Sequence, residues 1–178
     1  LLGVSITGHE RIWLQHADPS PKRQALLKNW LFANSIHTID LLRFFGGEIS
    51  RLETVTQKYR EPGGDQFGVL VEFQQGGIGT YSAHWYSPGG WSAILYGDGV
   101  TVEFKPLESG RWIDREFRSH DIEPDLVDRD LKPGFFRQMQ AFGDFVSSGV
   151  LQWPCQDIES VCLTLKIARS MSLDHVGK

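Results

Sequence analysis

The sequence predicts an α+β fold in which a mainly antiparallel, open β-sheet carries helices packed on one face. Three observations lead to this prediction. Between Pro21 and Gly46-Gly47 apolar residues recur at helical spacing, and from there they alternate with polar ones, as is typical of strands. Glycine-rich turns divide the alternating region into short segments, and two further helical segments close the chain. Helices on either side of a run of hairpin-linked strands indicate one sheet covered on one face.

The first 47 residues are expected to form two strands followed by a helical region. The apolar runs LLGVSIT (1–7) and RIWLQHA (11–17) favour strands. A helix is expected to start at Pro21 with Ser20 as its cap, because proline is favoured in the first turn. Further on, this helix either continues or is followed by a second one, and Gly46-Gly47 ends the region. The candidate caps of a second helix are Asn34 and Ser35.

The central region is expected to form an antiparallel meander of roughly five or six strands, because short alternating segments are joined by tight turns. The expected strands cover residues 49–59, 66–75, 78–87, 91–97, 100–107 and 110–117. Residues 120–132 are polar and are expected to be irregular, and helices are expected within 133–149 and 155–174. Their apolar stripes contain Phe135, Met139, Phe142 and Val146 in the first helix and Ile158, Cys162 and Leu165 in the second.

A sheet covered on one face leaves the other face open, and the chain offers few further elements to cover it. Four large aromatic residues occur close together in this region, namely Tyr81, Trp85, Tyr86 and Trp91. They predict a subunit interface or the floor of a ligand site on the open face. The alternative is that they form ordinary cross-strand pairs in the core.

Composition and charge exclude several classes of protein. The chain has 178 residues, 40% of them hydrophobic and 22% charged, which is typical of one globular domain covering residues 1–178. A net charge of −4 argues against nucleic acid or an anionic membrane as partner. Cys155 and Cys162 form no CxxC pair, so neither a disulfide framework nor a zinc site is indicated, and a reducing, cytoplasmic setting is favoured. The chain opens at Leu1 directly in an apolar run, as expected of the middle of a longer fold.

Few residues indicate chemistry. The glycine pairs lie at turns between strands and not in a strand–GxGxxG–helix context, so the sequence predicts no dinucleotide site. His9 and His16 have no carboxylate at metal-ligand spacing, and His175 is expected to lie at the terminal surface.

His37 is the main candidate for a catalytic residue. It occupies the first turn of an apolar helix, from which a side chain can reach a pocket, and its ordinary pKa suits general acid–base work. Asp40 follows at i+3 and Asn34 precedes it by one turn, so both are candidates to orient the imidazole. The alternative is a histidine satisfied within the core.

Several passages together resemble the C-terminal domain of the glucose-fructose oxidoreductase / inositol dehydrogenase / MocA (Gfo/Idh/MocA) family. They are NSIHTIDLLRFFGGEISRLETV, GVLVEFQQGGIGTYSAHWYSPGGWSAILYGDGVTVEF, FRQMQAFGDFVSSG and DIESVCLTLKIARSMSLDHVGK. The resemblance extends from about residue 30 onward. Many members have an aspartate four residues before the histidine, where this chain has Ala33, and Asn34 is the nearest polar side chain.

The resemblance implies the C-terminal domain of an NAD(P)-dependent oxidoreductase acting on a sugar, polyol or related hydroxyl compound. His37 matches the family's catalytic histidine, which accepts the hydroxyl proton. His84 and Trp85 are candidate substrate contacts in the pocket floor. NAD or NADP would bind in an N-terminal Rossmann domain absent from this chain, which alone is expected to hold no cofactor and to be inactive. The open sheet face would form a homodimer or homotetramer. The alternative function is a stand-alone, non-catalytic binding or assembly module.

Overall fold

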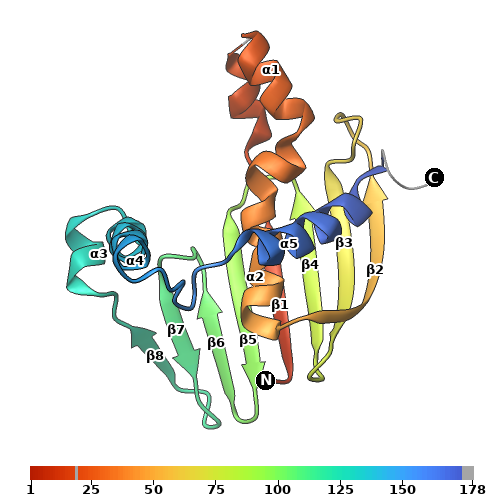
Figure 1. The fold of residues 1–178 in the computed structure, drawn as a ribbon. Helices are drawn as coiled ribbons and strands as arrows, with labels where there is room; N and C mark the ends of the chain where they lie inside the picture. The colour runs from red at the N-terminus through yellow and green to blue at the C-terminus, as the bar shows by residue number, and fades with distance from the viewer. Residues whose placement is uncertain (19, 174–178) are drawn as a thin grey trace.

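A computed structural model describes residues 1–18 and 20–173 and shows two layers, an eight-stranded sheet and a set of helices on one of its faces (Figure 1). The sheet is open, and all its neighbouring strands but one pair run antiparallel, so the predicted fold class is confirmed. The strands are β1 (Gly3–Gly8), β2 (Ile49–Gln57), β3 (Gln66–Phe73), β4 (Ile78–His84), β5 (Trp91–Gly97), β6 (Val100–Phe104), β7 (Gly110–Ile113) and β8 (Ser119–Ile122).

The order of the strands differs from a meander. It is β2-β3-β4-β1-β5-β6-β7-β8, so β1 lies between β4 and β5, parallel to the former and antiparallel to the latter. The six strands expected within 49–117 all form, but the predicted meander is interrupted between β4 and β5, because β1 inserts there and pairs with segments more than 70 residues away. Glycine permits close approach at the end of β1, since a Cβ on Gly8 would lie 2.6 Å from the Tyr81 hydroxyl.

The helical region between β1 and β2 is nearly continuous. Helix α1 (Pro21–Lys28) starts as predicted, with the Ser20 hydroxyl accepting a hydrogen bond from the Arg23 amide at 3.2 Å. A π-helical turn (Leu31–Ser35) leads directly into α2 (Ile36–Gly46), which ends at Gly47 with φ +86°. Helix α1 ends at Lys28, so the first helix does not simply continue; a second helix forms, as the other alternative predicted, but neither Asn34 nor Ser35 makes a side-chain cap hydrogen bond to it.

Two segments were assigned wrongly from the sequence. Residues Ile12–Ala17 form a 3₁₀ helix instead of the expected strand, and they bury only Ile12. The nearby strands β4 and β5 are both already paired with β1. Residues 12–17, which follow β1, therefore have no strand edge there to pair with. The stretch 120–132, expected to be irregular, contains the end of β8 and the short helix α3 (Leu126–Asp130). The polar edge strand β8 pairs with β7 on one side only, which explains its weak apolar alternation.

The core lies between the sheet and two helices, α2 and α5 (Ile158–Met171). Helix α2 lies over the central strands and α5 crosses β4, β3 and β2 (Figure 1). Tyr81 and Trp85 are buried in this core, so the prediction that they lie on an aromatic open face is wrong. The alternation along β4 directs Tyr81 towards α2, where its hydroxyl lies 3.4 Å from that of Thr38. One row across the open face is polar and aliphatic instead, and contains Glu53, Leu70, Thr80, Ser5, Ile94 and Glu103.

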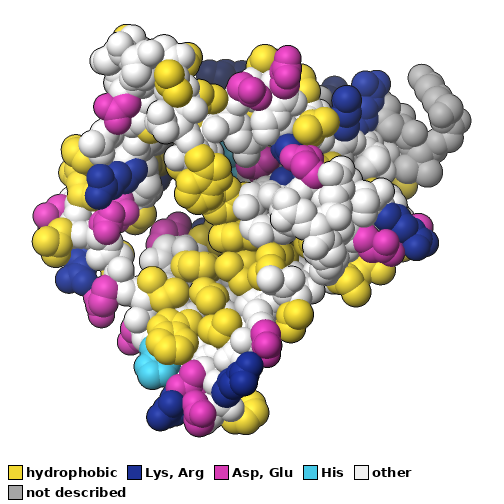
Figure 2. Space-filling model, turned by 60° about the horizontal axis from the view of Figure 1, so that its bottom comes forward, with side chains coloured by type: hydrophobic (Ala, Val, Ile, Leu, Met, Phe, Trp, Pro, Cys, Tyr) yellow, Lys and Arg dark blue, Asp and Glu magenta, His cyan; other side chains and the backbone are white. Residues whose placement is uncertain are grey.

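Helix α4 (Phe135–Ser148) carries the predicted apolar stripe but does not bury it against the described part of the chain. Phe135, Met139, Phe142 and Val146 are 50–68% exposed, because α3 and α4 stand beside β7 and β8 at the edge of the molecule (Figure 1). Seen from the β5–β6 hairpin end, hydrophobic side chains line a hollow in the surface (Figure 2).

In α5 the buried positions are Thr164, Ala168 and Met171. The predicted stripe is wrong for Ile158 and Cys162, which are exposed, whereas Leu165 is half-buried. No helix among the described residues is long and apolar enough to cross a bilayer.

Candidate functional site

His37 lies in the first turn of α2, immediately after the π-helical turn, and its side chain is exposed. The imidazole is near the start of β5, where the centroid of its ring is 6.3 Å from that of Trp91 and the planes are tilted by 46°. The helix thus presents a titratable group at the end of the central strands, as the sequence predicted for a residue in a first turn.

A buried carboxylate that sequence reasoning missed lies beneath this turn. Glu10, just after β1, is only 6% exposed. Its two carboxylate oxygens accept hydrogen bonds from the Asn34 amide at 3.0 and 2.9 Å, and one of them accepts a third from the Ser35 hydroxyl at 3.1 Å. Both donors belong to the π-helical turn, and such turns are frequent at functional sites. The signal available in the sequence was only a glutamate that directly follows an apolar strand.

Burial sets the electrostatics of this network. Desolvation raises the pKa of Glu10 above its ordinary value, and the hydrogen bonds from Asn34 and Ser35 oppose that rise. Burial also raises the pKa of Tyr81, and the negative charge of Glu10 adds to the effect. Glu10 is therefore a carboxylate whose protonation is easier than in water, close to a helix turn that presents an imidazole.

A cavity of about 280 Å³ adjoins the same end of the sheet. It is lined by His9, Glu10 and Arg11 after β1, by residues 89–91 including Trp91, and by residues 106–108. Trp91 is shared between the cavity and the ring contact with His37, so the imidazole lies at the border of a space suited to a small ligand.

The other predicted orienting residue, Asp40, faces α5. Its carboxylate accepts hydrogen bonds from the Gln156 amide at 2.6 Å and from the Thr164 hydroxyl, and Arg43 lies 3.9 Å away. Among the described residues no hydrogen bond joins Asp40 to His37, so the geometry gives Asp40 the task of holding α2 on α5.

His84 and Trp85 lie on opposite sides of the sheet. The His84 amide donates a hydrogen bond to Nδ1 of His9 at 3.2 Å, and the two rings stack with centroids 5.4 Å apart on the open side. Burial lowers the pKa of His9, and the positive charges of His84 and Lys105 lower it further. Trp85 packs in the core against Phe67, 5.2 Å between centroids, and borders a different cavity from the one beside His37.

Comparison with known proteins assigns the chain to a family. The sequence profile of the GFO/IDH/MocA C-terminal domain matches residues 5–103, more than half of the chain. The chain belongs to the Gfo/Idh/MocA family. A search of curated protein sequences finds no match.

Solved structures share the fold of this Gfo/Idh/MocA domain at low sequence identity. A UDP-N-acetylglucosamine 3-dehydrogenase from Acidithiobacillus ferrooxidans has a TM-score of 0.73 at 10% identity, over 96% of this chain and 52% of the other. Levoglucosan dehydrogenase in complex with NADH and levoglucosan has a TM-score of 0.71 at 18% identity, over 96% and 55%. An Agrobacterium radiobacter oxidoreductase in complex with NAD+, L-tartaric acid and magnesium has a TM-score of 0.72 at 15% identity, over 96% and 53%. The chain therefore spans about half the length of these proteins.

The connections in this Gfo/Idh/MocA chain do not fit a dinucleotide. The described strands that lead into a helix, β1 and β8, do so through His9-Glu10-Arg11 and Glu123-Pro124-Asp125. Neither connection offers the glycine-rich cradle that a pyrophosphate requires.

The remaining histidines that the structure describes form no metal site. Within residues 1–18 and 20–173, no three His, Cys, Asp or Glu side chains are grouped as metal ligands would be. His16 instead contacts the Tyr86 hydroxyl at 2.9 Å and Glu61 at 3.2 Å, and His175 lies outside the described residues.

Proposed function

We propose that this chain is the C-terminal domain of an NAD(P)-dependent oxidoreductase that transfers hydride between nicotinamide and a sugar, polyol or related hydroxyl compound. The observation that carries the proposal is His37, exposed in the first turn of α2 and in ring contact with Trp91 at the border of a cavity that contains Glu10. Support comes from the family and from relatives of the same fold that include dehydrogenases of levoglucosan and UDP-N-acetylglucosamine. NAD or NADP belongs, in this proposal, to an N-terminal Rossmann domain of the full-length protein.

The residues of this chain handle the proton. His37 accepts it from the substrate hydroxyl as the hydrogen on the same carbon leaves as hydride, and the carbon becomes a carbonyl. Nicotinamide supplies the hydride acceptor when it is bound. Asn34 positions the turn before His37 through Glu10, and Asp40 holds the same helix on α5. The contacts of His84 and Trp85 with substrate stay predictions.

An assay of oxidoreductase turnover by the full-length natural protein tests the proposal. Nicotinamide absorbance is followed with NAD and NADP against a panel of sugars and polyols, and we expect oxidation of at least one. Replacing His37 with Gln should lower kcat by about 10²–10⁴-fold with little change in KM. His120→Gln, on β8, is the matched control and should retain activity. Unchanged kcat in His37→Gln would contradict the role of His37, and the isolated 178-residue chain should give no turnover.

A second candidate function is a stand-alone assembly module, favoured by the exposed apolar face of α4 and the open sheet face. In either case we propose a homodimer or homotetramer formed through the open face. Turnover distinguishes the functions, because both expect assembly: light scattering should show that His37→Ala still assembles, and only the oxidoreductase has an activity to lose. A natural protein that assembles but oxidises no substrate in the panel favours the module.

A further inference from the structure

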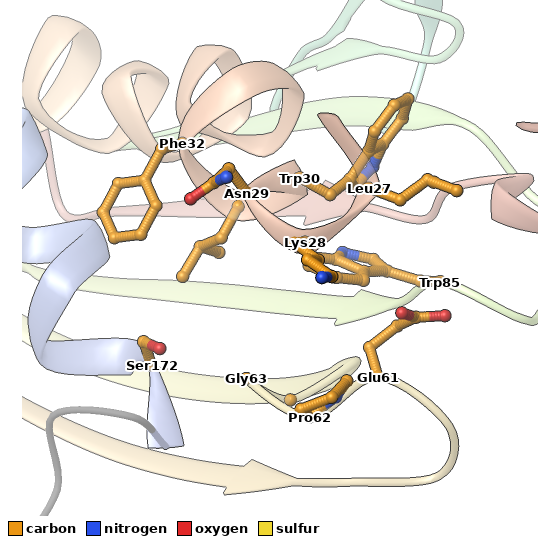
Figure 3. A pocket seen from close by; sticks show the side chains of 12 residues that line it. Leu27, Lys28, Asn29, Trp30, Phe32, Glu61, Pro62, Gly63, Trp85 and Ser172 are labelled. Carbon is orange, nitrogen blue, oxygen red and sulfur yellow. The ribbon is translucent and has the colours of Figure 1, made fainter. Parts of the chain in front are cut away.

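A second cavity, of about 300 Å³, shares no lining residue with the one beside His37. Its walls come from the end of α1 and the π-helical turn (residues 27–32), from the turn 61–64 that joins β2 to β3, and from Trp85 and Ser172 (Figure 3). The turn is fixed in shape, because Asp65 accepts hydrogen bonds from the backbone amides of Tyr59, Arg60 and Glu61. The cavity is therefore built from held segments at the end of the sheet.

Trp85 brings an unsatisfied donor to this cavity. Its side chain is 3% exposed, and its indole Nε1 has no hydrogen-bond partner among the described residues. The ring cannot easily turn away, because it packs against Phe67 in the core. Buried indole N–H groups usually have a partner, so this one points to an acceptor that occupies the cavity.

Two opposite charges reach the same space. Figure 3 shows Lys28 from α1 and Glu61 from the β2–β3 turn on either side of the Trp85 indole. Lys28 is exposed and forms no ion pair with any described residue, so its ammonium can donate to a ligand. Oε1 of Glu61 accepts the Tyr86 hydroxyl, whereas Oε2 has no hydrogen-bond partner in the described part of the chain.

These three groups are two donors and one acceptor; Asn29, whose amide donates to the Ala25 carbonyl, Trp30 and Ser172 also line the cavity. The indole N–H and the ammonium both require an acceptor on the ligand, and a carboxylate satisfies both at once. Oε2 of Glu61 requires a donor, which a hydroxyl or ammonium group supplies. Apolar walls from Leu27, Leu31 and Phe32 and the small volume exclude a large ligand.

We propose that this cavity binds a small carboxylic acid that carries a hydroxyl or ammonium group on the adjacent carbon. The carboxylate accepts hydrogen bonds from Trp85 and Lys28, and the adjacent group donates to Glu61. This site is separate from the one assigned to His37 and does not depend on the proposed oxidoreductase function.

The indole N–H resonance of Trp85 provides a direct test. In a ¹⁵N-labelled chain each of the six tryptophans gives one indole signal, and Trp85→Phe identifies the relevant one. If that variant does not fold, the five other Trp→Phe variants identify the signal by elimination. Glycolate, glycine and acetate are then titrated separately. We expect the Trp85 signal to move and saturate, with glycolate or glycine binding about tenfold tighter than acetate, which lacks the donor for Glu61. A stronger response to glycolate indicates a hydroxy acid, and one to glycine an amino acid.

Exposed residues supply the controls. Lys28→Gln should weaken binding of all three probes by about tenfold, whereas Lys22→Gln, on the same helix but outside the cavity, should not. A Trp85 signal that none of the probes moves means that the cavity holds water only, and it overturns the proposal. The proposal is also overturned if Lys28→Gln and Lys22→Gln bind the probes with equal affinity. It is likewise overturned if acetate binds as tightly as whichever of glycolate and glycine binds better.

Discussion

Glu10 shows what a buried charge costs in this chain. Its pKa is raised by burial, so the folded state takes up a proton more readily than the unfolded chain. The stabilisation from that proton is fully present below the ordinary glutamate pKa, and it is lost as pH rises through the folded-state pKa. Above the folded-state pKa the ionised side chain is therefore a net cost, offset in part by Asn34 and Ser35.

We predict that Glu10→Gln raises the free energy of unfolding at neutral pH, because the neutral amide is cheaper to bury. The gain should disappear below pH about 4, where glutamate is protonated in both states. Urea denaturation at the two pH values measures it. Glu53→Gln, exposed on β2, is the control and should show no such pH-dependent gain. A loss of stability at neutral pH in Glu10→Gln would show that the hydrogen bonds outweigh the desolvation.

His9 is expected to act in the opposite direction. Burial and nearby positive charge lower its pKa, and its Nδ1 must be unprotonated to accept the His84 amide. Its contribution to stability is present above the ordinary histidine pKa and is lost as pH falls through the folded-state pKa. Replacing His9 with Gln should therefore flatten the fall in unfolding free energy below pH about 6.5. Thermal unfolding at several pH values measures this, with His120→Gln as control. If His9 plays no part, the unfolding free energy of His9→Gln will fall with pH as steeply as that of the unmodified chain.

At this scale the sequence predicted part of the candidate site. The first-turn position of His37 follows from local helix signals, and the structure has it there. Glu10 could not be found in the same way, because its partners lie 24 and 25 residues further along the chain. Asp40 at i+3 was near His37 by spacing, yet its carboxylate is engaged with Gln156, 116 residues away.

Among the elements, α2 and α5 are joined by one buried guanidinium. Arg43 pairs with Glu48 and donates to the Ser160 carbonyl at 2.7 Å and to the Thr164 hydroxyl at 2.8 Å. The Arg43 side chain is only 6% exposed, so its loss leaves several acceptors without a partner. The contact fixes the two helices that cover the sheet.

Arg43→Ala is predicted to cost about 2–4 kcal/mol of unfolding free energy, because a buried, multiply bonded charge is removed. Arg51→Ala is the matched control, since Arg51 forms only surface pairs with Glu53 and Glu72 and should change stability by about 0.5 kcal/mol or less. Chemical denaturation of both variants measures the difference. Equal effects would mean that Arg43 adds nothing beyond a surface pair.

The hairpins were predictable from the sequence and the position of β1 was not. Tight hairpin turns need residues with positive φ, which glycine adopts easily, so glycines mark these turns in the sequence. Gly76, Gly77 and Gly99 do have positive φ in the structure. The partner of β1 is chosen by long-range packing, with Val4 paired to Gly79 on one side and Leu95 on the other. No local pattern encodes such a pairing, and the same holds for the 3₁₀ segment Ile12–Ala17.

For the whole molecule, the largest departure from the predicted packing is the exposed face of α4. Exposed apolar patches of this kind usually mark a surface that contacts another protein surface. Figure 2 shows further hydrophobic side chains in a hollow of the surface, so the exposed apolar area is not confined to the α4 stripe.

Replacing Met139 and Phe142 together with Lys and Glu should change the unfolding free energy of the isolated chain by about 1 kcal/mol or less, because both side chains are exposed. The same variant should scatter less light at high concentration if the face drives association. A charge-matched double variant on the polar face of α4, Gln140→Lys with Ser147→Glu, should leave association unchanged. Strong destabilisation by the first variant would indicate that α4 packs on its own chain.

The insertion of β1 between β4 and β5 has a consequence for synthesis on the ribosome. Strand β1 needs residues 78–82 on one side and 91–96 on the other. The backbone donors and acceptors on its two edges therefore stay unpaired until residues 78–82, and then residues 91–96, have been translated. The hairpin of β2 and β3 can form earlier, since its partners are adjacent along the chain. Until its partners are made, the segment Gly3–Gly8 is a binding site for a chaperone. The pairs that join β1 to β4 and β5 form only after the chaperone releases it.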